Sequence, residues 1–404
     1  MRVVRAMLAI AIASASAGAC VPETPVGDLI QQRDSSGIVI VEHGPSALTT
    51  VPRWTLSETP IVEIGGSAGD PNDELYRVQA VKQSNTGDIL VLNSGTSEIR
   101  KYDRVGRHLL NIGRRGSGPG EFAAPLWLVV DRTDSILVYD LRLQRFSLFD
   151  AEGNPGREVL VQDRDIGLRQ TAGLLRDGSL LIPHAPGPQA MVNGLRRDTA
   201  VLRRISTTGE ELPPLGTFPG REYFDLVEGP GTGVTQYRAF GRSLEIALAD
   251  SVLYVGPTDN YEIRMYTHAG VLRGIIRVAI PPVRVTDDMK AAHTRTALAF
   301  FQDSASRARF GRLEEIMSFP PTIPGFSRLA TDTDQNLWVR GYPVHPDSNS
   351  DWHVFDPAGR LSAVTRLPAG FVERIFDRDR VIGTWTDEDG VERVRVYELR
   401  RTPS

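Results

Sequence analysis

A short pattern recurs along the chain and constrains the fold more than any other feature of the sequence. A strand-like run ends in an aromatic or branched apolar residue, and a glycine follows four residues later. The pattern occupies residues 102–106, 149–153, 205–209, 266–270 and 355–359, and a run at 394–397 lacks the glycine close to the end of the sequence. Repeats of this kind bury their apolar faces only against neighbouring units. The chain is therefore predicted to stack similar units.

A second marker, a short apolar strand, runs in phase with the first. These strands begin at Ile89, Ile136, Leu180, Val252, Leu337 and Val381. Their first residues are 47, 44, 72, 85 and 44 residues apart. The short spacings fit one four-stranded propeller blade, which takes about 40 to 50 residues. The two long spacings indicate insertions into similar units.

The two ends of the chain complement each other. The last repeat stops after its third strand, near Leu399, and residues 61–65 resemble residues 109–113, the fourth strand of the first blade. We therefore expect an all-β, six-bladed β-propeller whose N-terminal strand completes the last blade, because closure removes two exposed sheet edges. Residues 37–41 form another strand candidate, expected at the same edge.

One insertion, at about 284–318, has helical character. Thr286 is a suitable N-cap, and Asp287 and Asp288 are favourable in the first turn. Met289 and Ala297 then recur at near-helical spacing, followed by Phe300 and Phe301. The insertion either packs on one face of the propeller or covers a ligand site as a lid.

The N-terminus has the features of an export signal. Residues 1–19 combine Arg2 and Arg5 with an apolar stretch too short to span a bilayer, as in a signal peptide. Residues 17–20 resemble a bacterial lipobox, which makes Cys20 the lipidation site, residues 20–35 a tether and residues 36–404 the propeller. Val21 is not an acidic retention signal, so we expect an outer-membrane lipoprotein. An ordinary signal-peptidase site, giving a secreted or periplasmic protein, remains the alternative.

Composition excludes several classes of partner and bond. The formal net charge is −4 and there is no block of Lys or Arg, so we expect no nucleic-acid partner. The single cysteine allows no internal disulfide. We expect a monomer that meets the membrane only through its lipid anchor.

The segment 113–125 has the sequence GRRGSGPGEFAAP, and Asp140 closes the strand that follows. This segment resembles the NHL-repeat consensus, with its glycine-rich turn, Pro-Gly-Glu-Phe and a later proline. The mature chain resembles exported bacterial six-bladed propeller lipoproteins that carry one such repeat. The resemblance implies the fold and almost nothing about chemistry. The glycines serve the turn between blades, Phe122 wedges between blades, and Glu121 pairs with Arg114 or Arg115.

Motifs for catalysis are weak. The seven histidines show no metal-binding spacing, although His184 and His345 both follow a second strand. No nucleophile elbow occurs. Lactonase-like propellers hold a divalent metal at the axis, and Asn93, Asp140 and Asp259 occupy comparable connections. Such oxygen ligands would suit Ca²⁺ or Mg²⁺.

The loops that follow the second strands should lie on the same face of the ring as the loops between blades. Binding sites are usually formed by loops on a rigid scaffold. The candidate ligand-binding residues there are Asp140, Arg142, Arg145, His184, Tyr261, Arg340 and Trp385. The leading hypothesis is an envelope-anchored binding or scaffold protein without a cofactor, recognising a polar ligand, peptide or glycan. The alternatives are a Ca²⁺- or Mg²⁺-dependent lactonase- or lyase-like enzyme at the axis, and an assembly role with an envelope protein.

Overall fold

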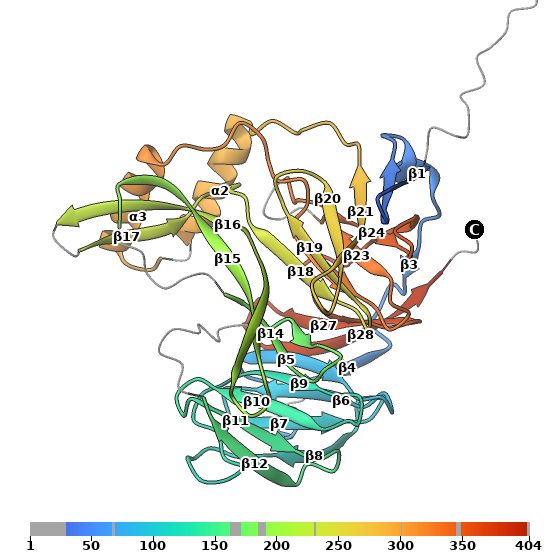
Figure 1. Ribbon diagram of the computed structural model, residues 1–404. Coiled ribbons are helices and arrows are strands. Elements are labelled where there is room, and N and C mark those ends of the chain that lie inside the picture. The colour runs from blue at the N-terminus through green and yellow to red at the C-terminus, as the bar shows by residue number, and fades with distance from the viewer. Residues whose placement is uncertain are drawn as a thin grey trace, which may run out of the picture.

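The computed structural model describes residues 30–66, 69–161, 171–184, 191–229, 232–299, 301–344 and 349–401. Its strands form six separate sheets, which follow one another along the chain (Figure 1). The leader, Cys20 and most of the tether lie outside the described residues. The strands begin at Ile30, so β1 occupies the six residues that we expected to end the tether.

The first two blades are four-stranded antiparallel sheets. The first contains β5 (Val78–Gln83), β6 (Ile89–Asn93), β7 (Glu98–Tyr102) and β8 (His108–Ile112). The second contains β9 (Pro125–Val130), β10 (Ile136–Asp140), β11 (Arg145–Phe149) and β12 (Pro155–Leu160). The second strands are buried along their whole length, because both faces of each sheet are covered by neighbouring blades.

The next two blades are enlarged. The third contains β13 (Gly173–Leu174), β14 (Leu180–His184), β15 (Gly194–Ile205), β16 (Glu211–Gly229) and β17 (Thr232–Tyr237). The fourth contains β18 (Leu244–Leu248), β19 (Val252–Pro257), β20 (Glu262–Thr267) and β21 (Leu272–Val278), extended by β2 (Ile38–His43) and β1 (Ile30–Ser35).

The last two blades and three helices complete the molecule. The fifth blade contains β22 (Arg328–Thr331), β23 (Leu337–Arg340), β24 (Asp351–Phe355) and β25 (Leu361–Arg366). The sixth contains β26 (Val372–Phe376), β27 (Arg380–Thr386) and β28 (Glu392–Arg400), joined by β3 (Thr55–Leu56) and β4 (Val62–Ile64). The helices are α1 (Ala47–Thr50), α2 (Asp287–Ala299) and α3 (Ser304–Ile316).

The ring closes as expected. Strand β4 pairs antiparallel with β28, with Glu63 opposite Arg395 and their side chains 2.6 Å apart. An apolar cluster then joins Ile64, Ile382 and Val394 of the sixth blade to Ile89 and Val91 of the first. Five further clusters lie at the other seams between successive blades. The all-β, six-bladed propeller with N-to-C closure is therefore confirmed.

The repeated glycines form the turns between third and fourth strands. Their φ angles lie between +80° and +87°. Each glycine amide donates to the carbonyl three residues earlier at 2.8–3.0 Å. A side chain is strained at such φ values, so the recurring sequence pattern reflects a recurring turn.

The strand at 37–41 is not where we expected it. Strand β2 pairs in parallel with β21 of the fourth blade, far along the ring from the closing edge. Val41 is buried there, and the Nε2 atom of His43 lies 2.9 Å from the carbonyl oxygen of Gly359 in the fifth blade. The chain then passes the fifth blade, where Arg53 bridges Val364, before it reaches the sixth. The N-terminal segment thus ties the outer edges of three blades together.

Two insertions rise from one end of the ring. The helical insertion is confirmed and contains two helices, α2 and α3. Residues 218–229, which lie in the first of the two long spacings, continue β16, and this part of β16 pairs antiparallel with β17. Figure 1 shows β15, β16 and β17 reaching to the two helices. The Nε atom of Arg309 on α3 lies 3.2 Å from Oε1 of Glu228 on β16.

Candidate functional site

A groove of about 1070 Å³ runs along the seam between the fourth and fifth blades, on the face that carries the helices. Its walls come from the connections after β19 and β23 and from the two ends of the helical insertion, at 280–283 and 322–325. Prolines 281, 282 and 324 and three valines provide apolar surface. Such a concave, largely preformed hollow with a few polar groups is the usual setting of a ligand site.

Arg242 lines part of this groove. The backbone amide of Arg242 donates to the Glu222 carboxylate at 3.1 Å, and its Nη2 donates to the Thr322 hydroxyl at 2.8 Å. Its Nη1 is buried and has no hydrogen-bond partner among the described residues. Burial lowers the pKa of this guanidinium, and Glu222 and Asp259 partly oppose the shift.

The nearby carboxylates already have partners of their own. Asp259 accepts two hydrogen bonds from Arg197, both 2.7 Å long, and Glu222 accepts one from Arg238 at 3.0 Å. The cluster therefore contains three arginines and two carboxylates, and Arg242 makes no ion pair within the described chain. A partly buried charge without a counter-ion is costly, which favours an anionic ligand group at this place.

A tyrosine and a histidine form a fixed part of the wall. The hydroxyl of Tyr261 lies 2.7 Å from Nδ1 of His353, and the two rings stack. Burial raises the pKa of Tyr261 well above its usual value and lowers the pKa of His353 to about 4. At neutral pH a protonated phenol thus faces a neutral imidazole, and the pair shapes the groove without carrying charge.

The N-terminal strand β2 supplies another part of the lining. Arg277 donates to Glu42 and to Glu262, each at 2.9 Å, and the hydrogen bond from Arg277 lowers the pKa of Glu42. These three lining residues carry one positive and two negative charges. The groove therefore presents both an unpaired cation and a region rich in acid.

Two of the three residues of the second blade that we expected to bind ligand instead make hydrogen bonds within the protein. The Asp140 carboxylate is buried and accepts hydrogen bonds from four backbone amides, those of residues 123, 124, 142 and 143, at 2.7–3.0 Å. Arg145 is buried too and donates to the Glu158 carboxylate and to the carbonyls of 117, 118 and 121. Both hold the turn at 113–125 in place. Arg142 is exposed.

The other four candidates come from four different blades. Tyr261 lines the groove, and Arg340 ends β23 immediately before Gly341, which also lines it. His184 ends β14 in the third blade. Trp385 lies under the guanidinium of Arg395, 3.6 Å from the ring centre, in the sixth blade. The groove thus gathers one of the seven candidates and borders a second.

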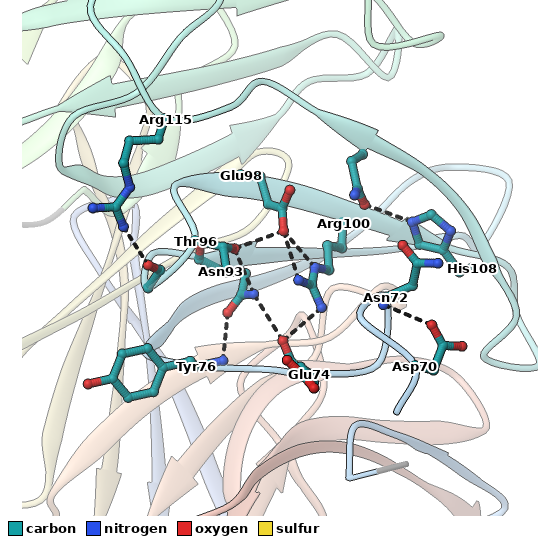
Figure 2. A network of polar contacts seen from close by, with 12 residues as sticks. Asp70, Asn72, Glu74, Tyr76, Asn93, Thr96, Glu98, Arg100, His108 and Arg115 are labelled. Atoms are coloured by element: carbon teal, nitrogen blue, oxygen red, sulfur yellow. Dashed lines mark hydrogen bonds and ion pairs between the residues drawn. The ribbon is translucent and has the colours of Figure 1, made fainter. Parts of the chain in front are cut away.

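The residues suggested for a divalent metal are held by protein groups. Figure 2 shows Asn93, whose amide oxygen accepts from the Tyr76 amide at 2.7 Å and whose nitrogen donates to Thr96 at 2.9 Å. Asp140 binds backbone amides and Asp259 binds Arg197, as described above. Among the described residues, no group of three or more His, Cys, Asp or Glu side chains could hold a metal ion. His345 lies outside the described residues.

Sequence reasoning did not identify Arg242 or His353. Arg242 lies just before a strand without any motif, and His353 alternates with apolar residues in β24, which indicated no more than a strand. Tyr342 and Val344 line both the groove and a second hollow of about 470 Å³, which lies beside α2 and α3.

The glycine-rich turn behaves as its residues suggested. Phe122 is fully buried between the first and second blades, and the Nε of Arg114 donates to Glu121 at 2.8 Å.

Within the described part of the chain, no helix is long and apolar enough to cross a membrane.

Comparisons with known proteins agree on the fold. A family model described as DUF5128, 6-bladed beta-propeller, matches residues 72–163. No curated protein matches the chain. A protein from Bacteroides fragilis described as exported superposes with a TM-score of 0.50 at 12% identity, covering 90% of this chain and 100% of its own. A DUF4221 member from Bacteroides vulgatus gives 0.50 at 11% identity, covering 87% and 100%.

A weaker similarity involves an enzyme. Virginiamycin B lyase from Staphylococcus aureus superposes with a TM-score of 0.38 at 11% identity, covering 92% of this chain and 99% of the lyase. At that level it carries no argument about activity. The comparisons therefore support a six-bladed propeller.

Proposed function

We propose that this protein is an envelope-anchored binding lipoprotein that recognises a polar peptide or glycan in the groove between its fourth and fifth blades. Arg242 is the observation that carries the proposal. It is a partly buried guanidinium in a groove of about 1070 Å³, and the ion pairs of its neighbours leave it without a counter-ion among the described residues. A carboxylate or other acidic group of the ligand would supply that counter-ion.

The rest of the groove suits such a ligand. Proline and valine side chains offer contact area, Asn260 and Tyr342 offer hydrogen-bonding groups, and Tyr261 is held rigid by His353. A preorganised wall lowers the entropy cost of binding. Figure 1 shows the helices and β15–β17 standing beside this part of the ring.

Binding can be tested with an acidic peptide library and a glycan array probed with the mature protein. We expect ligands retained by the native protein to be lost by Arg242→Met and kept by Arg107→Met. Arg107 is 80% exposed on a turn at the opposite end of the ring, so it is a matched control. Ligands that bind Arg242→Met as tightly as the native protein would overturn the proposal for this groove.

Two further variants test the wider face. Arg142→Ala and Trp385→Ala change residues that the sequence suggested as ligand contacts, outside the groove. If recognition is confined to the groove, both keep full affinity. A loss in either variant would extend the site across the ring.

Export and anchoring belong to the same proposal and rest on the leader and Cys20. Mass spectrometry of the mature N-terminus should detect a lipidated Cys20. An unmodified cysteine at the N-terminus would rule out the anchor while leaving the groove untouched.

A further inference from the structure

The innermost strands of three blades bring basic residues together at the axis of the ring. Strands β22, β26 and β5 belong to the fifth, sixth and first blades, and they carry Arg328, Arg374 and Lys82. Their neighbouring ends are linked by one carboxylate. Asp377, just after β26, accepts from Thr333 at 2.9 Å and from Gln83 at 3.3 Å. The three strands therefore lie side by side.

Two of these three cations lack a partner within the part of the chain that the structure describes. Nη1 of Arg328 lies 2.8 Å from Oε1 of Glu373 in an ion pair, and the Glu373 side chain is only 3% exposed. The side chains of Lys82 and Arg374 make no hydrogen bond or ion pair with the described residues, and the Nε atom of Arg374 is buried without a partner. Both residues are partly buried. Uncompensated charge in such a place destabilises the empty site.

The nearby carboxylates do not contact these two cations. Glu373 is bound to Arg328, Glu392 accepts from the Val78 amide at 3.0 Å, and Glu245 accepts from the Ser243 hydroxyl at 3.1 Å. Burial also raises the pKa of Glu245 to about 6. These acids moderate the local potential, but Glu373 pairs with Arg328 and the other two accept hydrogen bonds elsewhere.

The pKa shifts of Lys82 and Arg374 reflect burial first and repulsion from neighbouring basic groups second. Burial lowers the pKa of the Lys82 ammonium, and the charges of Arg374 and Arg328 lower it further. Burial likewise lowers the pKa of Arg374, with Arg328 adding to the shift and Glu373 and Glu392 partly opposing it. An anion between Lys82 and Arg374 would reverse the repulsive part of both shifts.

We propose that the axis of the ring holds a small oxyanion, a phosphate group, between Lys82 of β5 and Arg374 of β26. A guanidinium offers a planar fork of donors, and an ammonium adds a compact charge, which together suit a tetrahedral dianion. Arg328 adds positive potential while it remains paired with Glu373. This site is separate from the groove, and neither depends on the other.

The probe is inorganic phosphate, added to the mature protein at constant ionic strength, with binding measured by calorimetry and by thermal unfolding. We expect saturable binding and a rise in Tm, because a ligand that binds only the folded state stabilises it. Lys82→Met and Arg374→Met should each weaken phosphate binding by about tenfold or more, as expected for loss of a charge-assisted contact. Arg107→Met should bind like the native protein.

Two further measurements distinguish a loss of phosphate binding from a loss of folding. Without phosphate, Lys82→Met and Arg374→Met should be as stable as the native protein or more stable, since each removes an unpaired charge. Arg374→Lys keeps the charge and should retain weakened binding, even if the methionine variants fold poorly. Equal phosphate responses in the native protein and all three axial variants would overturn the proposal.

A second titration identifies the source of the phosphate group. Glucose 6-phosphate tests whether a phosphorylated small molecule reaches the axis as well as the free ion does. Tighter binding than inorganic phosphate, lost in Arg374→Met, assigns the site to such a molecule. Weaker binding assigns it to the free ion. Binding of neither compound would contradict the inference.

Discussion

At the scale of single residues, the polar side chains on the loop-rich face divide into those that hold backbone and those that lack partners. Asp140 and Arg145 looked like ligand contacts because they are charged and follow a buried strand. Their side chains are instead occupied by the amides and carbonyls of the neighbouring glycine-rich turn. Arg242 looked ordinary in sequence, yet it keeps an unpaired Nη1.

Asp140 therefore has a structural role that a stability measurement can detect. Asp140→Ala should lower the free energy of unfolding by about 3 kcal/mol, because four amides lose a buried charged acceptor. Arg142→Ala, two residues away and exposed, should change it by less than about 0.5 kcal/mol. Urea unfolding of both variants checks this. Equal effects would show that the carboxylate is not holding the turn.

His353 should make stability depend on pH. Its pKa is lowered by burial from 6.5 to about 4. The unfolded chain therefore binds more protons than the folded protein between these values, and stability rises with pH across this window. The contribution is complete above pH 6.5 and is lost as pH falls to about 4, amounting to about 3 kcal/mol.

The comparison with His353→Gln isolates this effect from that of other groups. The stability difference between the native protein and the variant should change by about 3 kcal/mol between pH 4 and 7. Tyr261→Phe keeps the buried imidazole and should keep the pH dependence. If the stabilities of the native protein and His353→Gln changed with pH in the same way, the burial of the His353 imidazole would be contradicted.

At the scale of elements, the two strands of the N-terminal hairpin differ in how far their side chains are buried. Strand β1 exposes all six of its side chains, whereas β2 buries Ile40, Val41 and His43 against the fourth and fifth blades. The turn between them, Ser36 and Gly37, has positive φ at both residues, as in a type I′ hairpin. Only β2 covers the edge of β21.

Deleting the two strands separately should therefore have different effects. Removal of residues through Ser35 should leave stability nearly unchanged. Removal through His43 should cost about 4 kcal/mol, since it exposes buried apolar side chains and the edge of β21, while β3 and β4 still close the ring. Thermal unfolding with circular dichroism measures both. Similar losses in the two truncations would contradict the pairing of β2 with β21.

The sequence predicted the repeating elements well because their determinants are local. The glycine turns at 106, 153, 209, 270 and 359 need positive φ, and each second strand is apolar on both faces. The position of β2 was not predictable in this way. The outer edges of the blades resemble one another in composition, and the chain after His43 is long enough to pass the fifth blade before reaching the sixth.

The groove was also beyond sequence reasoning, for a related reason. Its lining comes from β2, from the connection before β18, from two blades and from both ends of the helical insertion. Tyr261 was identified because it follows a second strand. Arg242 and His353 acquire their significance only from neighbours that are distant in sequence.

At the scale of the whole molecule, closure of the ring determines where every surface lies. The seam between the sixth and first blades carries an apolar cluster like the other five, and β4 reaches it from the N-terminal side. Lys82 and Arg374 belong to the first and sixth blades, which become neighbours only through this closure. The proposed axial site therefore presupposes a closed ring of six sheets.

Cross-linking between Glu63 and Arg395 tests closure most directly. The two residues are opposite each other in β4 and β28, within the range that a disulfide spans. In a Cys20→Ser background, Glu63→Cys with Arg395→Cys should oxidise readily, raise Tm and migrate as a compact species without reductant. Glu63→Cys with Arg400→Cys, five residues out of register, should not. Failure of the first pair to cross-link in folded protein, or equal cross-linking of both pairs, would contradict the closed propeller.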